Sequence, residues 1–141
     1  MSEFRVRATR ILLNAASSED ATSLGLEVGF SAEDEAADVV ELTYQLQDAA
    51  GVSVAEEWTG KLSILDGNAE PYGDALAFEA DVTTGTAETA VTRPIVVAAS
   101  DASGTLVFDV TDVVGASGTT VYVEMRANVG GHYSVESITF D

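Results

Sequence analysis

The sequence predicts an all-β protein, built as a sandwich of two antiparallel sheets with seven to nine strands. Apolar and polar residues alternate in nine segments, which is typical of strands that bury one face. Short turn sequences containing Asp, Ala and Gly separate several of these segments. No long stretch has helical periodicity, and 141 residues with 46% hydrophobic content are enough for one independent core.

Six of the nine segments alternate clearly. In chain order they are Leu24–Phe30, Val40–Gln47, Trp58–Ile64, Leu76–Val82, Leu106–Val110 and Val121–Arg126. Because successive side chains of a strand point to opposite faces, each segment has one dry side and one wet side. Two sheets stacked on their dry sides bury all of these apolar faces at once.

Three weaker segments complete the set. They are Phe4–Leu13, Val91–Ala99 and Tyr133–Phe140. In the last one, Tyr133 and Val135 share a face by strict count. Ile138 and Phe140 then fall on the opposite face. A bulge at Glu136–Ser137 is expected to bring both pairs to the same face.

Turn sequences mark the ends of several strands. Asp48-Ala49-Ala50-Gly51 and Asp101-Ala102-Ser103-Gly104 each open with Asp and close with Gly, as tight turns do. Asn128–Gly131 is expected to join the last two strands as a hairpin. Ser31–Asp38 is short and acidic, and the sequence predicts a loop or a single helical turn there.

The charge of the chain is strongly unbalanced. Twenty-four acidic residues face six basic ones, which gives a net charge of −18. Residues 1–10 carry +2, from Arg5, Arg7 and Arg10 against Glu3, and this leaves −20 on residues 11–141. Such a field repels phosphate backbones and anionic membranes, so neither is expected as a partner. Abundant carboxylates with one lysine, Lys61, are also typical of proteins from salty habitats.

Enzymatic chemistry is not expected. The chain has no cysteine, which excludes disulfides, thiolate catalysis and cysteine-based metal sites. Its only histidine, His132, follows two glycines in a predicted turn, without a G-x-S-x-G elbow or a phosphate-binding glycine loop. Among so many carboxylates, close pairs arise by chance and do not indicate a glycosidase. We therefore predict no catalytic residues and no cofactor.

Two acidic segments offer oxygen ligands for a metal ion, Asp66-Gly67-Asn68-Ala69-Glu70 and Glu33-Asp34-Glu35. Calcium accepts roughly six to eight oxygens in loose geometry. Neither segment has the spacing of an EF-hand loop, so solvated loops are the favoured interpretation. No metal site is predicted, although calcium binding stays open as an alternative.

A few residues are candidates for contact with a protein partner. Tyr122 lies on the polar side of its strand, and exposed tyrosines suit protein interfaces. Arg5, Arg7 and Arg10 supply positive charge in a chain that is otherwise short of it. Arg5 and Arg7 are expected either to contact the partner or to form salt bridges with the acidic body. Trp58 is expected in the core of the sandwich.

Several stretches combine alternating strands with tight turns in a familiar order. They are residues 42–52 (LTYQLQDAAGV), residues 96–112 (VVAASDASGTLVFDVTD), residues 118–124 (GTTVYVE), Ser134-Val135 and Ile138-Thr139-Phe140. Through them, residues 39–141 resemble the small immunoglobulin-like structural proteins that tailed bacteriophages encode near their major capsid protein. The resemblance implies an immunoglobulin-like sandwich without catalytic residues. Residues 1–38 match nothing in that family and are expected to form an N-terminal arm or strands that contact a partner.

The function that the resemblance implies is that of a non-enzymatic virion protein that decorates or cements the capsid. Its partners would be the major capsid protein and copies of itself. Because Ile11-Leu12-Leu13 is too short for a signal-peptide core, the protein is expected to be made in the host cytoplasm. The arginines of Phe4–Leu13 are expected against the capsid shell, with the acidic body facing solvent.

Two alternatives stay open at this point. One is a tail-associated or adhesin-like module, because exposed strand edges can pair with a neighbouring subunit in either location. The other is a carbohydrate-binding or calcium-binding β-sandwich module of a salt-adapted microbe.

Overall fold

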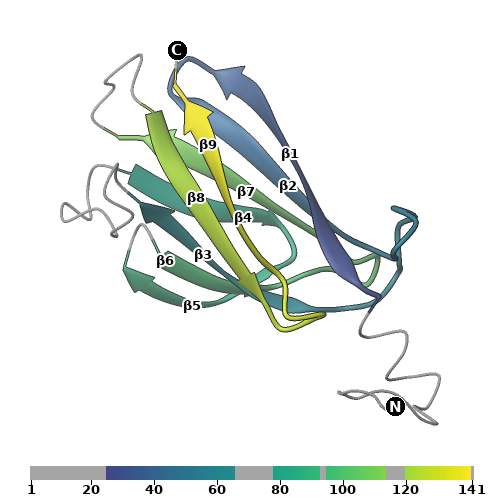
Figure 1. Ribbon diagram of the computed structural model, residues 1–141. Coiled ribbons are helices and arrows are strands. Elements are labelled where there is room, and N and C mark those ends of the chain that lie inside the picture. Colours follow the sequence, from purple (N-terminus) through teal and green to yellow (C-terminus); the bar gives the residue numbers. More distant parts are fainter. Residues whose placement is uncertain (1–24, 66–77, 93–94, 114–119, 141) are drawn as a thin grey trace, which may run out of the picture.

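The computed structural model describes residues 25–65, 78–92, 95–113 and 120–140, which form nine strands in two layers (Figure 1). The strands are β1 (Glu27–Ala36), β2 (Val39–Gln47), β3 (Thr59–Leu65), β4 (Phe78–Thr84), β5 (Thr86–Thr92), β6 (Ile95–Ala99), β7 (Thr105–Asp112), β8 (Thr120–Ala127) and β9 (Tyr133–Thr139). None of the described residues belongs to a helix that is long and apolar enough to span a membrane.

The strands form two antiparallel sheets. The four-stranded sheet has the order β1-β2-β7-β4, and the five-stranded sheet has the order β5-β6-β3-β8-β9. The order β1-β2-β7-β4 opposite β3-β8-β9 is that of the two sheets of an immunoglobulin constant domain, and the β5–β6 hairpin widens the second sheet. The predicted all-β sandwich of two antiparallel sheets is therefore confirmed.

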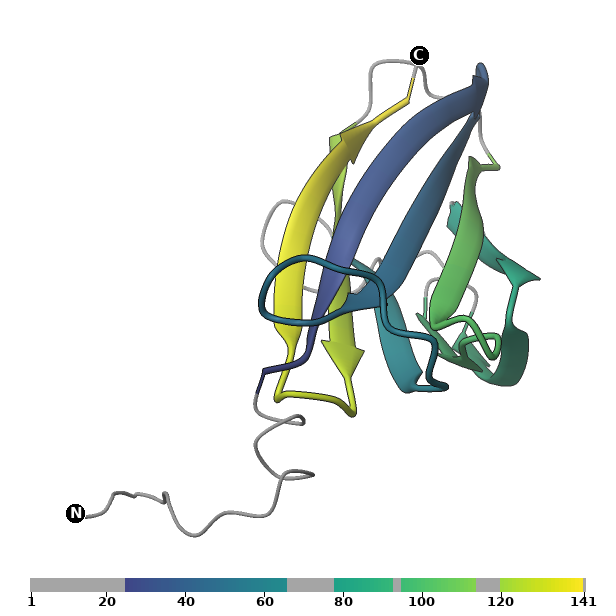
Figure 2. The ribbon, with the colours of Figure 1, turned by 90° about the vertical axis from the view of Figure 1, so that its right-hand side faces the viewer.

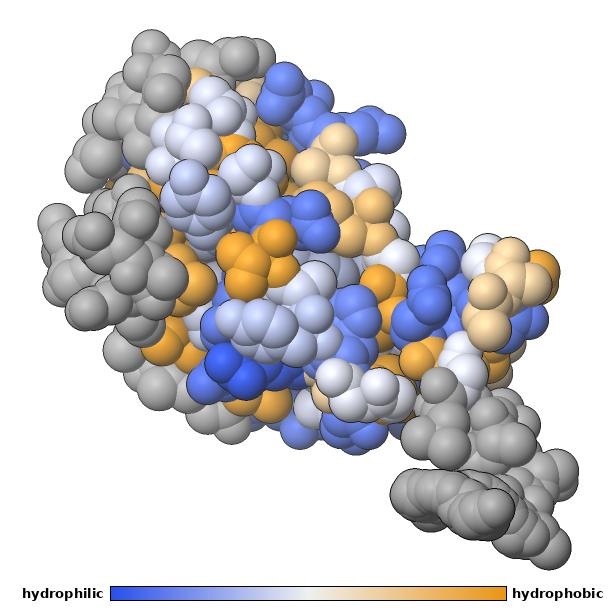
Figure 3. All heavy atoms as spheres, in the orientation of Figure 1, coloured by the Kyte–Doolittle hydropathy of each residue, from blue (hydrophilic) through white to orange (hydrophobic). Residues whose placement is uncertain are grey.

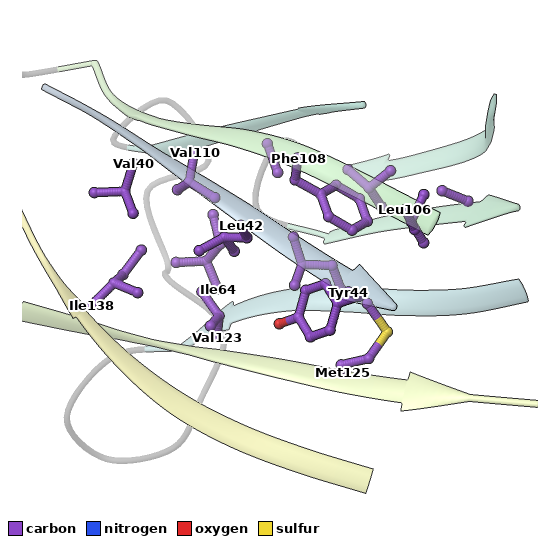
Figure 4. Packing of buried hydrophobic residues seen from close by; sticks show 14 of the residues in the cluster. Val40, Leu42, Tyr44, Ile64, Leu106, Phe108, Val110, Val123, Met125 and Ile138 are labelled. Atoms are coloured by element: carbon purple, nitrogen blue, oxygen red, sulfur yellow. The ribbon is translucent and has the colours of Figure 1, made fainter. Parts of the chain in front are cut away.

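The core lies between the sheets and is built from inward side chains of β1–β4 and β6–β9 (Figure 4). Its largest fully buried members include Tyr44, Phe108 and Phe140. Trp58 is 2% exposed, and its indole Nε1 donates a hydrogen bond to the carbonyl oxygen of Gly104 at 2.9 Å. The expectation that this tryptophan belongs to the core is therefore confirmed.

The two Asp-Ala-x-Gly sequences form turns with the same hydrogen bonds. In the first, Asp48 Oδ1 accepts from the backbone N–H groups of Ala50 and Val52, at 2.9 and 3.0 Å. In the second, Asp101 Oδ1 accepts from the N–H groups of Ser103 and Thr105 at the same two distances. The closing glycines, Gly51 and Gly104, have φ angles of 81° and 78°, which side-chain-bearing residues rarely adopt. Both turns follow from the sequence as predicted.

The prediction for Ser31–Asp38 was wrong. Residues 31–36 continue β1 and pair with β2, for example Glu33 opposite Glu41, and a turn at residues 37–38 closes the hairpin. All six residues from Ser31 to Ala36 are exposed. A strand that buries neither face needs no alternation, which is why period-2 analysis did not detect it.

Two further expectations about strands also need correction. The pairing of β9 with β8 is regular, so the bulge expected at Glu136–Ser137 is absent and Tyr133 and Val135 stay on the outer face. The expected segment Val91–Ala99 spans parts of two strands, β5 and β6, that pair as a hairpin. β5 is an edge strand that consists mostly of threonine and alanine, and its sequence lacks the alternation of a half-buried strand.

Candidate functional site

The outer face of the five-stranded sheet carries exposed aromatic and apolar side chains on β8 and β9. We call this the tyrosine surface; its members are Tyr122, Glu124, Arg126, Tyr133 and Val135. Tyr122, Tyr133 and Val135 are 38%, 50% and 42% exposed. In the register of the two strands, Val135 lies opposite Glu124 and Tyr133 opposite Arg126, so the five side chains are neighbours. Figure 3 shows apolar and polar side chains intermixed over this part of the face.

Polar contacts hold the tyrosine surface in place. The hydroxyl of Tyr133 donates a hydrogen bond to Glu124 Oε2 at 2.8 Å. The guanidinium of Arg126 lies 3.4 Å from the same carboxylate and 4.4 Å above the centroid of the Tyr133 ring. The hydrogen bond to Glu124 is the main reason that the pKa of Tyr133 is raised, so the ring stays neutral and keeps donating. A tyrosine fixed in this way loses little side-chain entropy when a partner covers it.

The only histidine of the chain directly precedes β9, next to the tyrosine surface. His132 is half-buried, and its Nε2 lies 3.2 Å from Ser134 Oγ. Desolvation lowers the pKa of His132, while Glu27 and Glu136 act in the opposite direction. The lowered pKa of His132 therefore follows from its partial burial beside the hairpin.

The outer face of the four-stranded sheet is acidic. Four carboxylates stand directly opposite one another on successive strands: Glu33 on β1 faces Glu41 on β2, which faces Asp109 on β7, which faces Asp81 on β4. We call these four the acidic row. No lysine or arginine occurs in any of the four strands. Like charges directly opposite each other destabilise a sheet, so the row is an electrostatic cost that the fold carries.

A bulge brings a further carboxylate beside the acidic row. The register of β1 with β2 shifts between Asp34 and Ala36, which leaves Glu35 between paired residues. Carboxylate oxygens of Glu35, Glu41 and Asp109 all lie within 4.8 Å of one another. The pKa of Asp109 is raised, first by burial, then by the charge and hydrogen bond of Glu35, and last by the charge of Asp81. The bulge re-aims an acidic side chain toward its like-charged neighbours.

In the described ranges, one group of acidic side chains has oxygens close enough together to share a cation: Glu35, Glu41 and Asp109. Carboxylate oxygens are the ligands that calcium and magnesium prefer. Three carboxylates from three strands provide about half of a calcium coordination shell. The arrangement by itself is that of a crowded acidic surface.

Of the candidate residues from the sequence, Tyr122 lies on the tyrosine surface, on the polar side of its strand as expected, and its contact with a partner stays a prediction. Arg5, Arg7, Arg10 and the segment Asp66–Glu70 lie outside the described residues. The sequence did not single out Tyr133 or Val135, because the expected bulge placed both on the inner face. It also did not single out Glu41 and Asp109, whose proximity depends on a strand register that alternation alone does not give.

Comparison with protein-family models found no match, and comparison with curated proteins found none either. The proposed function is therefore based on the side chains of the two outer faces.

Proposed function

We propose that this protein is a non-enzymatic structural protein of a phage virion, and that it decorates the capsid by docking its tyrosine surface on the capsid shell. The observation that carries the proposal is the group of exposed Tyr122, Tyr133 and Val135 on two paired strands. Tyrosine and arginine are enriched where protein interfaces gain most of their binding free energy.

The rigidity of the tyrosine surface supports a docking role. Its side chains project from regular antiparallel strands and not from loops, so their spacing is fixed before binding. Arg126 and Glu124 form polar contacts at its centre and offer a partner one charge of each sign. Mixed charges of this kind favour one orientation of the partner over others.

The acidic row supports the same orientation. It lies on the opposite outer face of the sandwich, so docking through the tyrosine surface leaves it in solvent. Exposed negative charge repels other particles and limits non-specific association. In this proposal the protein is made in the host cytoplasm, resides in the virion, and contacts the major capsid protein and neighbouring copies of itself.

The test is sedimentation of the purified protein with capsids that lack it, at low and high salt. We expect saturable co-pelleting at a fixed stoichiometry. Because the tyrosine surface contributes apolar area, its binding should weaken only modestly at high salt, by less than about tenfold. Heat-denatured protein is the control for non-specific pelleting.

Absence of co-pelleting would overturn the capsid proposal and favour the tail-associated alternative, which the same assay with isolated tails would detect. Binding that disappears at high salt would instead indicate that charged residues, such as Arg5, Arg7 and Arg10, form the contact.

A further inference from the structure

The strand β1 has an open edge that is long, exposed and acidic. β1 lies at the end of the four-stranded sheet and has β2 as its only neighbour among the described strands. Figure 2 shows it along the side of the sandwich, beside β9 but in the other sheet. An unprotected edge of this kind readily accepts another strand. Its final six residues, Ser31–Ala36, are exposed on both faces, so an added strand would meet no obstruction from the core.

The chain itself contains a segment with the complementary pattern. In Phe4-Arg5-Val6-Arg7-Ala8-Thr9, basic or polar residues alternate with apolar ones. A strand with this sequence presents Arg5 and Arg7 on one face and apolar groups on the other. The ten residues of Phe4–Leu13 equal the length of β1.

The spacing of the charges matches as well. Glu33 and Glu35 lie two residues apart on the outer face of β1, and Arg5 and Arg7 are also two residues apart. Arg7 can stand directly opposite Glu33 in a regular register, and Arg5 then lies beside Glu35, whose side chain the bulge turns toward Glu41 and Asp109. The positive charges would also approach Glu41, which lies opposite Glu33 and has only acidic neighbours across the strands.

We propose that Phe4–Leu13 pairs with the edge of β1 and so extends the four-stranded sheet of the same chain to five strands. In this register Arg7 lies opposite Glu33, and Arg5 lies beside Glu35. The added strand runs antiparallel to β1, because residues 14–26 then only need to turn back to the start of β1. A segment tethered this closely reaches an effective concentration of about millimolar, which favours the same chain over a second copy. The proposal goes beyond the docking function and assigns the arginines to the chain's own sheet instead of the capsid.

Cysteine cross-linking tests the proposal without removing any charge, and the chain has no native cysteine to interfere. With Arg7 opposite Glu33, Thr9 falls opposite Ser31, an exposed residue on the same face. The variant Thr9→Cys/Ser31→Cys should form an intramolecular disulfide under mild oxidation, since facing residues bring their Cβ atoms close enough. The matched control is Thr9→Cys/Ser137→Cys, because Ser137 is also an exposed serine in a strand, β9. We expect the first pair to react roughly tenfold faster or more.

Charge exchange then tests the role of the arginines. Adding Glu33→Lys/Glu35→Lys to the cross-linking pair should slow disulfide formation by roughly threefold to tenfold, and adding Arg5→Glu/Arg7→Glu as well should restore it. High salt should slow the parent pair without any further substitution. Melting curves control for folding, and Glu33→Gln/Glu35→Gln replaces the lysine variant if the latter is destabilised.

Three results would overturn the proposal. Equal rates for the two cysteine pairs would show that the segment does not lie along β1. A rate of disulfide formation that does not change with charge exchange or with salt would show that the arginines and glutamates do not attract each other. Disulfide-linked dimers that increase with protein concentration would show that a second copy supplies the strand. No capsid is needed for these measurements, so failure of the docking proposal would leave their outcome unaffected.

Discussion

The two outer faces of the sandwich differ in how their charged side chains are arranged. On the five-stranded sheet, Glu124 contacts the oppositely charged Arg126 and accepts a hydrogen bond from the neutral Tyr133. On the four-stranded sheet, charges of one sign meet, and Asp109 stands between Glu41 and Asp81 with no cation in those strands. Both basic residues of the described part of the chain, Lys61 and Arg126, lie on the five-stranded sheet.

The difference shows that net charge alone does not describe how charged side chains are distributed over the surface. A charge of −18 spread evenly would make every face repel a partner equally. Among the described residues, like charges face one another along the acidic row, and the other face carries the Glu124–Arg126 contact and exposed tyrosines. Stability and binding are therefore expected to respond to different substitutions on the two faces.

The largest expected effect is on binding through the tyrosine surface. The variant Tyr122→Ala/Tyr133→Ala should lose roughly 30-fold to 1000-fold in capsid affinity, because truncation of interface tyrosines often costs about 2–4 kcal/mol. Co-sedimentation titrations measure the affinity, and the melting temperature confirms folding. The matched control, Glu33→Gln/Asp81→Asn on the acidic row, should bind as tightly as the parent. Equal loss in both variants would contradict the assignment of the interface.

The next effect is on stability, at the middle of the acidic row. Glu41→Lys should stabilise the fold by about 1–2 kcal/mol, because it turns repulsion with Glu33 and Asp109 into attraction. Urea denaturation at low salt measures the change. Glu57→Lys, at an exposed position outside the strands, changes the net charge equally and should shift stability by less than about 0.5 kcal/mol. If both variants gain the same stability, net charge and not the row is responsible.

A smaller effect depends on pH. The pKa of Asp109 is raised in the folded protein above its ordinary value of 3.8, so the folded state holds this proton more tightly than the unfolded state. The stabilisation that this tighter proton binding gives the folded state is therefore fully present below pH 3.8, and it is lost as the pH rises through the pKa of Asp109 in the folded protein. Asp109→Asn should remove this loss and stabilise the protein at neutral pH by about 0.2–1 kcal/mol. Urea midpoints from about pH 4 to pH 7 should fall less in the variant than in the parent; parallel curves would contradict the prediction.

The smallest effect is expected on the other face. Lys61 stands opposite Arg126 across β3 and β8, and both side chains are exposed. Lys61→Glu should stabilise the fold by only about 0.2–0.5 kcal/mol, since solvent screens exposed pairs. Lys61→Gln separates loss of repulsion from gain of attraction in the same urea assay. A gain as large as that of Glu41→Lys would mean that the two faces do not differ electrostatically.

Alternation predicted the sandwich because core strands such as β2 must bury every second side chain. The turns at Asp48 and Asp101 were predictable because each depends on contacts within five residues. The continuation of β1 to Ala36 was not, since an edge strand exposed on both faces has no apolar period. Of the candidate surfaces, Tyr122 was found because its strand has a clear wet side, whereas the grouping of Glu35 with Glu41 and Asp109 requires both a bulge and a long-range register.

The two Asp-Ala-x-Gly turns share their hydrogen bonds but differ in their surroundings. A Cβ at Gly104 would collide with the carbonyl oxygen of Val54, and the glycine's own carbonyl accepts from both Trp58 Nε1 and the N–H of Leu46. A Cβ at Gly51 would meet no atom within 4 Å, and Ala49 and Ala50 are exposed. The Asp48–Gly51 turn is therefore a natural place to insert a foreign peptide, where the sandwich would carry an epitope or affinity tag without repacking its interior.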